Sequence, residues 1–280
     1  MSGLVWRKAK NAGMTLIMGA FTLAVLIPLA IIFVHIIRMG FSSINPDFFT
    51  QIPKPTGEAG GGMANGLFGS AILIFLSSLL GIPIGIFGAI YLTEYGGGRV
   101  SDIIRFCADV LSGIPSIITG MVAYTLFVVP MKSFSALAGA FALALIMIPI
   151  VLRTTEEQLK LVPNSLREAS LALGIPMWRT TLKVTLRSAL AGVMTGILLS
   201  IARISGETAP LLFTALGNQF WSRKLTEPIA SMPLQIFSFA ISPYDDWHRL
   251  AWAGALVLVS IMFGLSLAAR YLGRTKRQSN

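Results

Sequence analysis

Charged residues are scarce in this chain of 280 residues, in which Asp, Glu, Lys and Arg together make up 12%. A soluble globular domain usually carries about 25%. Apolar residues reach 54%, and many of them are gathered in long runs without a charge. This combination excludes an ordinary water-soluble fold, and it also excludes a disordered chain, which would be poor in apolar residues.

Cysteine and histidine are nearly absent, since the chain holds one cysteine, Cys107, and two histidines, His35 and His248. A single cysteine cannot form an internal disulfide, which excludes a disulfide-stapled scaffold. No Cys/His cluster has the spacing of metal ligands, and no Walker A motif is present to bind ATP. We therefore predict neither a metal site nor a catalytic residue.

Five runs without a charged residue are long enough for a membrane-spanning helix, which needs about 20 apolar residues. They contain 27, 35, 22, 20 and 20 residues and lie between Lys10 and Arg38, Glu58 and Glu94, Asp109 and Lys132, Lys132 and Arg153, and Arg249 and Arg270. A sixth apolar run, 189–213, is interrupted by Arg203 and Glu207. The sequence predicts an all-α, polytopic membrane protein with six transmembrane helices.

The first apolar run is too long for the core of a signal peptide, about 7–15 residues, so we expect a retained helix. Lys and Arg near spans stay cytoplasmic. The two terminal segments and the loops 93–109 and 153–187 carry fifteen of these residues, against six in the opposite loops. This asymmetry predicts that both termini are cytoplasmic. It also accounts for the net charge of +10 without nucleic acid.

Three segments are expected along the chain. Residues 1–66 would hold the cytoplasmic N-terminus, the first transmembrane helix and an outer loop. Residues 67–272 would form a core of five helices that includes the cytoplasmic loop 153–187, and 273–280 a cytoplasmic basic tail. The glycine-rich run 57–66 lacks the Lys-Ser/Thr of a phosphate-binding loop, so a flexible connector is expected there. Pro115 is expected to kink the third span.

The loop 153–187 has signals for two short helices. Ser165 and Glu168 match a capping box, Gly174 can end the first helix in the left-handed conformation, and a second helix would run over about 177–186. Two interpretations remain open, a compact knob or an amphipathic loop lying on the lipid headgroups.

Small and polar residues recur on one face of the predicted fifth span. Those within an arc of about 120° are Ser188, Gly192, Gly196, Ser200, Arg203 and Glu207. Small residues let another helix approach closely, and an arginine inside a bilayer costs about 2.5–3.5 kcal/mol on insertion scales. We therefore expect this face to lie against protein or along a pore.

Two interpretations of Arg203 and Glu207 remain open. An ion pair at i, i+4 can neutralise itself and hold the packing. Alternatively, Arg203 lowers the barrier for an oxyanion, which suits a planar guanidinium, while Glu207 holds it. Ser205 and Thr208 can donate hydrogen bonds to an oxyanion, although bonding back to the helix is the commoner fate of such hydroxyls.

The loop 153–187 resembles the signature loop of ABC importer permeases, which reads Glu-Ala-Ala, three residues, Gly, nine residues, Ile-x-Leu-Pro. The residues in register with this pattern are Glu168, Ala169, Ser170, Gly174, Val184 and Leu186; Ser170 stands in place of the second Ala and Arg187 in place of the Pro. The run 202–210, Ala-Arg-Ile-Ser-Gly-Glu-Thr-Ala-Pro, is similar to the fifth-span motif of the phosphate-transporting permeases of that family, as are 218–221 and 250–255.

This resemblance implies a type I ABC importer permease in a bacterial inner membrane, without catalytic residues, for ATP-driven uptake of inorganic phosphate. Its partners would be a second related permease, a dimer of ATPase subunits that bind ATP and Mg²⁺, an external phosphate-binding protein and membrane lipid. The coupling loop would use Glu168, Ala169, Ser170 and Gly174, and the substrate path Arg203, Glu207, Thr208 and Ser205. The alternatives are a permease for another oxyanion, such as molybdate or sulfate, and a membrane scaffold or sensor without transport.

Overall fold

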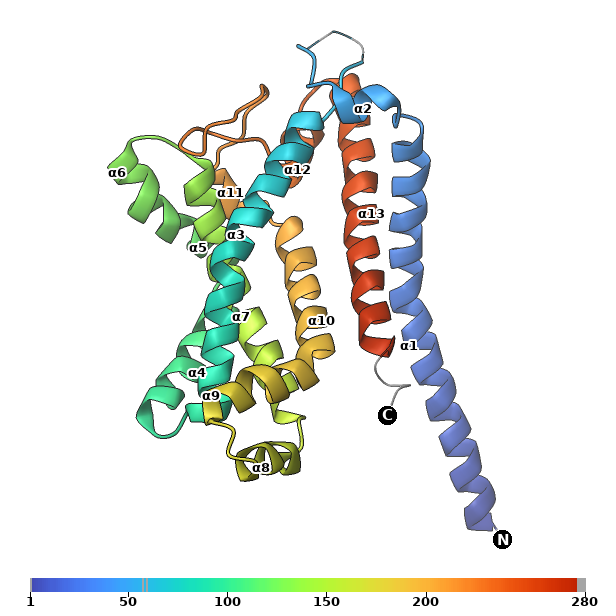
Figure 1. Cartoon of the computed structure of the whole chain (residues 1–280). Coiled ribbons are helices and arrows are strands. Elements are labelled where there is room, and N and C mark those ends of the chain that lie inside the picture. The colour runs from blue at the N-terminus through green and yellow to red at the C-terminus, as the bar shows by residue number, and fades with distance from the viewer. Residues whose placement is uncertain (1, 57, 59, 276–280) are drawn as a thin grey trace.

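The computed structural model describes residues 2–56, 58 and 60–275, and the regular structure of these residues is helical. Figure 1 shows two groups of long helices. One group is the pair α1 (Ser2–Phe41) and α13 (Asp245–Thr275), and the other holds α3 (Ala64–Ile90), α7 (Ala136–Lys160) and α10 (Leu186–Ser205). Helix α10 packs against both α7 and α13 and so joins the groups. The predicted all-α fold is confirmed.

Five stretches of the described chain are long and apolar enough to cross a membrane. They are Gly3–Phe41, Ala64–Tyr95, Ala136–Lys160, Met177–Ser205 and Asp245–Tyr271. A sixth candidate is the pair α4 (Arg99–Gly113) and Ser116–Met131, which passes the same test together but is bent by 106°. With this bent pair counted as one span, the number agrees with the six that the sequence predicts.

The third span is not the single kinked helix that the sequence predicted. Helix α4 ends at Gly113, and α5 (Ser116–Ala123) starts in a new direction after Pro115. Proline disfavours the helical conformation at the residue before it, and Ile114 is accordingly extended, with ψ 131°. The π-helical turn η2 (Tyr124–Val128) and α6 (Val129–Met131) continue α5. The bend separates α4, which packs on α7, from α5, which also contacts α11 (Ala209–Leu212).

Helices α3 and α7 cross closely because glycines of α3 face large side chains of α7. A Cβ placed on Gly85 would lie 2.8 Å from Cβ of Val151, and one on Gly81 would lie 3.1 Å from Cβ of Met147. Small residues at a helix–helix interface in a membrane protein let the two backbones approach closely. Val151 and Met147 belong to the main buried core.

A second core joins α13 to the connection between α1 and α3. It includes Phe48 of α2 (Pro46–Thr50), Met63, and Phe239 of α12 (Met232–Ala240). The glycine-rich run also packs here, because Gly61 has φ +87° and a Cβ on Gly62 would overlap the carbonyl oxygen of Asp47. Gly61 and Gly62 are therefore packed and do not form the flexible connector that the sequence predicted, while 57 and 59 lie outside the described residues.

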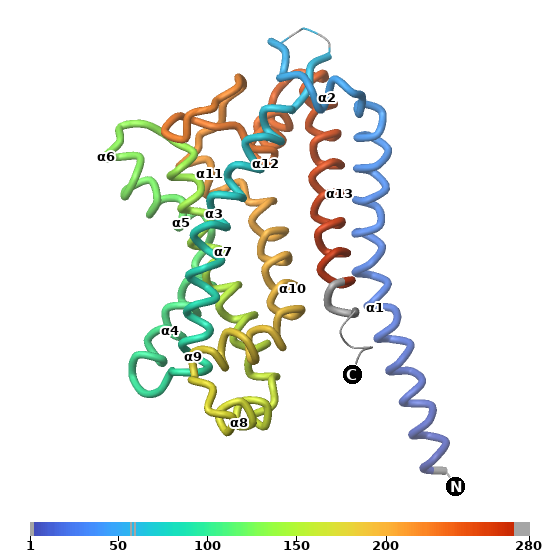
Figure 2. Tube along the Cα trace, in the orientation of Figure 1, coloured from blue at the N-terminus to red at the C-terminus, as the bar shows by residue number. Residues whose placement is uncertain are grey.

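The start of α1, the end of α13 and the short helix α8 (Asn164–Ala172) lie at the same end of the molecule (Figures 1 and 2). Helices α2 and α12 lie at the opposite end. The predicted segment boundaries do not coincide with the ends of helices. The one at 66 falls within α3, and the one at 272 falls within α13, with 276–280 outside the described residues.

Candidate functional sites

Residues 164–185 of the loop 153–187 fold as a compact knob, whereas residues 153–160 belong to α7. Helix α8 is followed by α9 (Met177–Thr180) and the π-helical turn η3 (Thr181–Thr185), which leads into α10 without a break. Met177 therefore begins a continuous stretch to Ser205, which starts before the span predicted from the apolar run 189–213 and also ends before it. Of the two arrangements left open, the chain adopts two short helices meeting at an elbow.

Gly174 forms the elbow as predicted. Its φ is +76°, its N–H donates to the carbonyl of Leu171 at 2.9 Å, and the N–H of Ile175 donates to the carbonyl of Ser170 at 3.3 Å. These two bonds are the Schellman ending of a helix. No atom lies within 4 Å of a Cβ placed on Gly174, so the requirement for glycine is one of backbone conformation and not of space.

The predicted capping box at Ser165 and Glu168 is wrong. Helix α8 already begins at Asn164, with Pro163 at the cap position and no side-chain hydrogen bond to the cap. Ser165 is therefore inside the first turn, where its hydroxyl cannot serve as the cap. Glu168 is free of that role and lies exposed, as does Ala169.

Ser170, the residue that departs from the Glu-Ala-Ala pattern, is buried. Its Oγ lies 2.8 Å from Oγ1 of Thr180, which joins α8 to α9 by a hydrogen bond between hydroxyls. An alanine at this position could not make the bond. The departure thus adds a polar contact within the knob.

The surface of the knob is rich in exposed apolar side chains. They are Leu166, Leu171, Leu173, Met177 and Trp178, the last with the guanidinium of Arg179 5.1 Å from its ring centre. Exposed apolar groups gathered on a small surface typically mark an interaction site. This surface lies at the α8 end of the molecule, beside the exposed Glu168 and Ala169.

Sequence reasoning missed a buried ion pair beneath α8. The Arg167 side chain is 17% exposed and the Glu94 side chain 4%, and Nη2 of the arginine lies 2.9 Å from Oε1 of the glutamate. Glu94 belongs to the π-helical turn η1 (Tyr91–Tyr95) that ends α3. The only signal in the sequence was a carboxylate placed directly after an apolar run.

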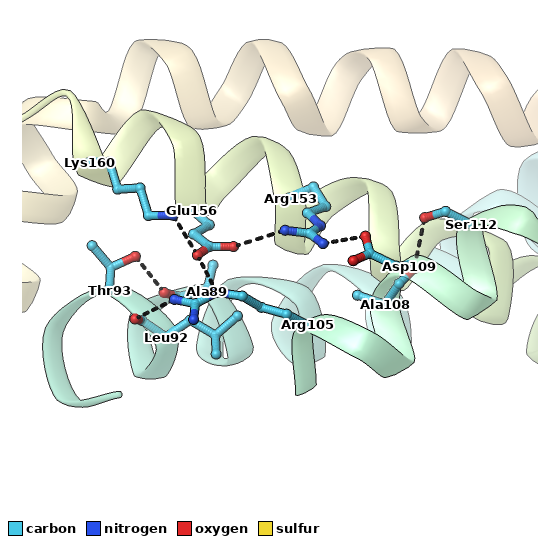
Figure 3. Close-up of polar contacts among 10 residues, drawn as sticks. All are labelled: Ala89, Leu92, Thr93, Arg105, Ala108, Asp109, Ser112, Arg153, Glu156 and Lys160. Atoms are coloured by element: carbon cyan, nitrogen blue, oxygen red, sulfur yellow. Dashed lines mark hydrogen bonds and ion pairs between the residues drawn. The ribbon is translucent and has the colours of Figure 1, made fainter. Parts of the chain in front are cut away.

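A second ion cluster, also missed, surrounds Glu156 of α7 (Figure 3). This side chain is 2% exposed and lies 3.0 Å from Nε of Arg105 and 2.7 Å from Nζ of Lys160. Arg153 approaches it at 3.7 Å and also pairs with Asp109 of α4. Arg105 is on α4 as well, so the cluster fastens α4 to the end of α7.

Arg203 and Glu207 form the ion pair that their spacing predicted, through Nη1 and Oε1. Their environments differ, because the Arg203 side chain is 58% exposed and that of Glu207 is 7% exposed. Glu207 does not lie on the helical face as predicted. Helix α10 ends at Ser205, with Gly206 as its cap, and Glu207 stands in the break before α11.

Ser205 and Thr208 are placed differently from Arg203. Ser205 is buried, and its hydroxyl donates to the carbonyl of Ile201 at 2.7 Å, the back-bonded state. It lines a cavity of about 10 Å³ together with Ser70 and Ser231. The carbonyl of Thr208 accepts the N–H groups of Leu211 and Leu212 and so begins α11.

The small-residue face of α10 packs against α7. A Cβ on Gly196 would lie 2.5 Å from Oγ1 of Thr154, and one on Gly192 would overlap the side chain of Gln158. The expectation that this face meets protein is confirmed. This face therefore packs on a helix of the same chain. The Arg203 side chain lies outside that contact and is exposed.

The described chain thus holds five helices long and apolar enough to cross a membrane, with the knob at one end of them. The family model described as "Binding-protein-dependent transport system inner membrane component" matches residues 81–278. The phosphate transport system permease protein PstA of Yersinia pestis is 46% identical over 97% of this chain and 92% of its own length. The chain therefore belongs to this family of inner-membrane transport components and, within it, to the PstA permeases.

Another relative supports the family membership, and two solved structures support the fold. The PstA protein of Xylella fastidiosa (strain 9a5c) is 51% identical over 85% of this chain and 83% of its own. A chain of the inward-facing MetNI methionine ABC transporter shares the fold, with a TM-score of 0.58 and 18% identity over 75% of this chain and 92% of that one. A chain of a bacterial alginate ABC transporter also shares the fold, with a TM-score of 0.58 and 13% sequence identity over 90% of this chain and 93% of that one. These two establish the fold as that of ABC transporter permeases.

Proposed function

We propose that this chain is the transmembrane permease subunit of an ATP-driven importer of inorganic phosphate and forms half of its translocation path. Relatives named as phosphate transport permeases, at 45–51% identity, support the substrate class. The partners are a second related, PstC-like permease, a dimer of PstB-like ATPase subunits and an external PstS-like phosphate-binding protein. ATP and Mg²⁺ bind to the ATPase, and this chain contributes no catalytic residue.

The chain lies in a bacterial inner membrane with both termini and α8 in the cytoplasm. The asymmetry of Lys and Arg between the loops supports this orientation. The start of α1, the end of α13 and α8 also share one end of the molecule. Glu168, Ala169, Ser170 and Gly174 then belong to a knob that faces the ATPase, where an amphipathic helix fits a groove of the partner.

The single observation that supports a phosphate path at Arg203 is the unequal exposure of the Arg203 and Glu207 side chains. A half-exposed guanidinium at a membrane-spanning helix would be costly against lipid, so it faces a partner subunit or water. Glu207 engages Nη1, and among the described residues the other guanidinium nitrogens have no hydrogen-bond partner. These nitrogens can hold two phosphate oxygens at once, while Glu207 keeps the resting site neutral.

The test is phosphate uptake by cells that produce the Arg203→Gln variant in place of the unsubstituted protein. Uptake should fall by about tenfold or more, because a charge-assisted contact contributes about 1.5–3 kcal/mol, while insertion and assembly persist. The control is Arg223→Gln, which removes an exposed arginine from the segment between α11 and α12. Normal uptake by Arg203→Gln would contradict the role given to this residue.

Competition separates the substrate classes. Unlabelled phosphate should displace labelled phosphate, whereas molybdate and sulfate should not. Displacement by either of those anions at similar concentrations would favour a permease for another oxyanion, and a complex that transports none of them would favour a scaffold or sensor.

A further inference from the structure

The guanidinium of Arg167 connects α8 to the ends of two long helices. Towards α3 it forms a fork with Glu94, in which Nε and Nη2 lie 3.0 Å and 2.9 Å from Oε1. Towards α7 it donates from Nη2 to the carbonyl of Leu159 at 2.9 Å and from Nη1 to the carbonyl of Val162 at 2.6 Å. Two further contacts are from Nε to Oε2 of Glu94 at 3.3 Å and from Nη1 to Oδ1 of Asn164 at 3.1 Å, and the second holds the start of α8.

These are the side-chain contacts that α8 makes with those two helices, and α7 is also joined to α8 by the three-residue segment 161–163. The body of α8 packs chiefly on α9 and η3, including the hydroxyl pair of Ser170 and Thr180. That route leads along the chain into α10. Arg167 supplies the route to α3 and α7, and the Glu156 cluster extends it from α7 to α4.

We propose that Arg167 and Glu94 are positioning residues that transmit a displacement of α8 to α3 and α7. The proposal rests on the proposed function, in which the ATPase moves α8. Packed interiors shift between discrete arrangements rather than deforming continuously. A fork whose carboxylate is buried and whose guanidinium is 17% exposed and bonded to two backbone carbonyls therefore moves the inner ends of α3, α7 and α4 together with the knob.

Geometry makes arginine necessary here. Its planar guanidinium presents five N–H donors in a fixed arrangement, whereas lysine is a point charge on a flexible stem. Lysine at 167 keeps the charge opposite Glu94, but its single nitrogen with three N–H donors cannot reproduce the six contacts that the guanidinium makes from three nitrogens. Arg167→Lys therefore isolates the mechanical connection from the charge.

The experiment uses the assembled complex in proteoliposomes with its binding protein, and measures phosphate transported per ATP hydrolysed. In Arg167→Lys this ratio should fall about fivefold or more, at the lower end of coupling between sites, while ATP hydrolysis continues. The control is Lys224→Ala, which removes an exposed ion pair with Glu227 in the segment between α11 and α12. An unchanged ratio in Arg167→Lys would overturn the proposal.

A cysteine pair gives the second measurement. In a Cys107→Ser background, Glu94→Cys with Arg167→Cys should show a low ratio, and bridging the two thiols with a short bifunctional reagent should raise it again. The ratio recovers only if positions 94 and 167 must be joined for α8 to move α3. If the contacts served stability alone, bridging the cysteines would not restore the ratio. Failure to recover, or loss of assembly in both Arg167→Lys and the cysteine pair, would assign the contacts to folding.

The two proposals fail in different ways. If the unmodified complex moves no phosphate, the proposed function is wrong. If it transports phosphate and Arg167→Lys keeps the same ratio, the proposed function stands and only the transmission through Arg167 is wrong.

Discussion

Single carboxylates hold the α8 end of this molecule together. The side chains of Glu94 and Glu156 are both buried; Glu94 pairs with Arg167 of α8, and Glu156 pairs with Arg105 of α4 and with Arg153 and Lys160 of its own helix. A buried carboxylate without partners would be severely penalised, and removing one member of such a group strands the others. The bound cations stay partly exposed, since the side chains of Arg105 and Lys160 are 34% and 55% exposed. Water can therefore take over part of their solvation.

Glu156→Gln tests the contribution of this cluster. The variant loses charge-assisted hydrogen bonds to Arg105 and Lys160, and we expect a loss of about 2 kcal/mol, limited by the exposure of the cations. The measurement is thermal inactivation of the purified complex in detergent. Glu157→Gln is the matched control, because Glu157 is the neighbouring residue and is exposed. Equal stability of the two variants would contradict the role of Glu156.

The knob shows how short elements are specified. Helix α8 has nine residues, too few to be stable alone in water, so its form depends on its ending and on its packing. The Schellman ending at Gly174 is encoded locally and was predictable. The start of α8 was not, because Pro163 determines it where the chain leaves α7, and the Ser165 and Glu168 pattern misled the prediction.

The left-handed conformation of Gly174 gives a prediction at this scale. Gly174→Val should lower the phosphate transported per ATP, because a β-branched residue at positive φ is strongly disfavoured and the elbow between α8 and α9 must open. Gly174→Asn is the control, since asparagine tolerates this conformation. Proteoliposome transport of both variants decides the matter, and full coupling in Gly174→Val would show that the elbow is dispensable.

At the scale of the whole molecule, the chain is built to be one part of an assembly. The most apolar window of α1 has none of its residues buried within this chain, and Arg203 is half exposed at a span. Lipid can cover the first surface but not the second. The exposed apolar knob at one end adds a further surface for a soluble partner.

Affinity purification of the full chain from native membranes in mild detergent should therefore recover a second, related permease and an ATPase subunit with Walker motifs. The expected ratio is one copy of each permease to two of the ATPase. Arg223→Gln should recover the same set, because it lies outside the proposed contacts. A chain that purifies alone, or only as copies of itself, would contradict the proposed assembly.

The sequence alone determined the features that depend on neighbouring residues. Runs without charge located the spans because hydrocarbon does not tolerate unpaired charge, Gly174 marked an elbow, and the i, i+4 spacing of Arg203 and Glu207 made them a pair. Tertiary structure decided the bend at Pro115 and the ion contacts of Arg167 with Glu94 and Arg105 with Glu156. Those partners are 73 and 51 residues apart, so only the packing of α3, α4 and α7 brings them within bonding distance.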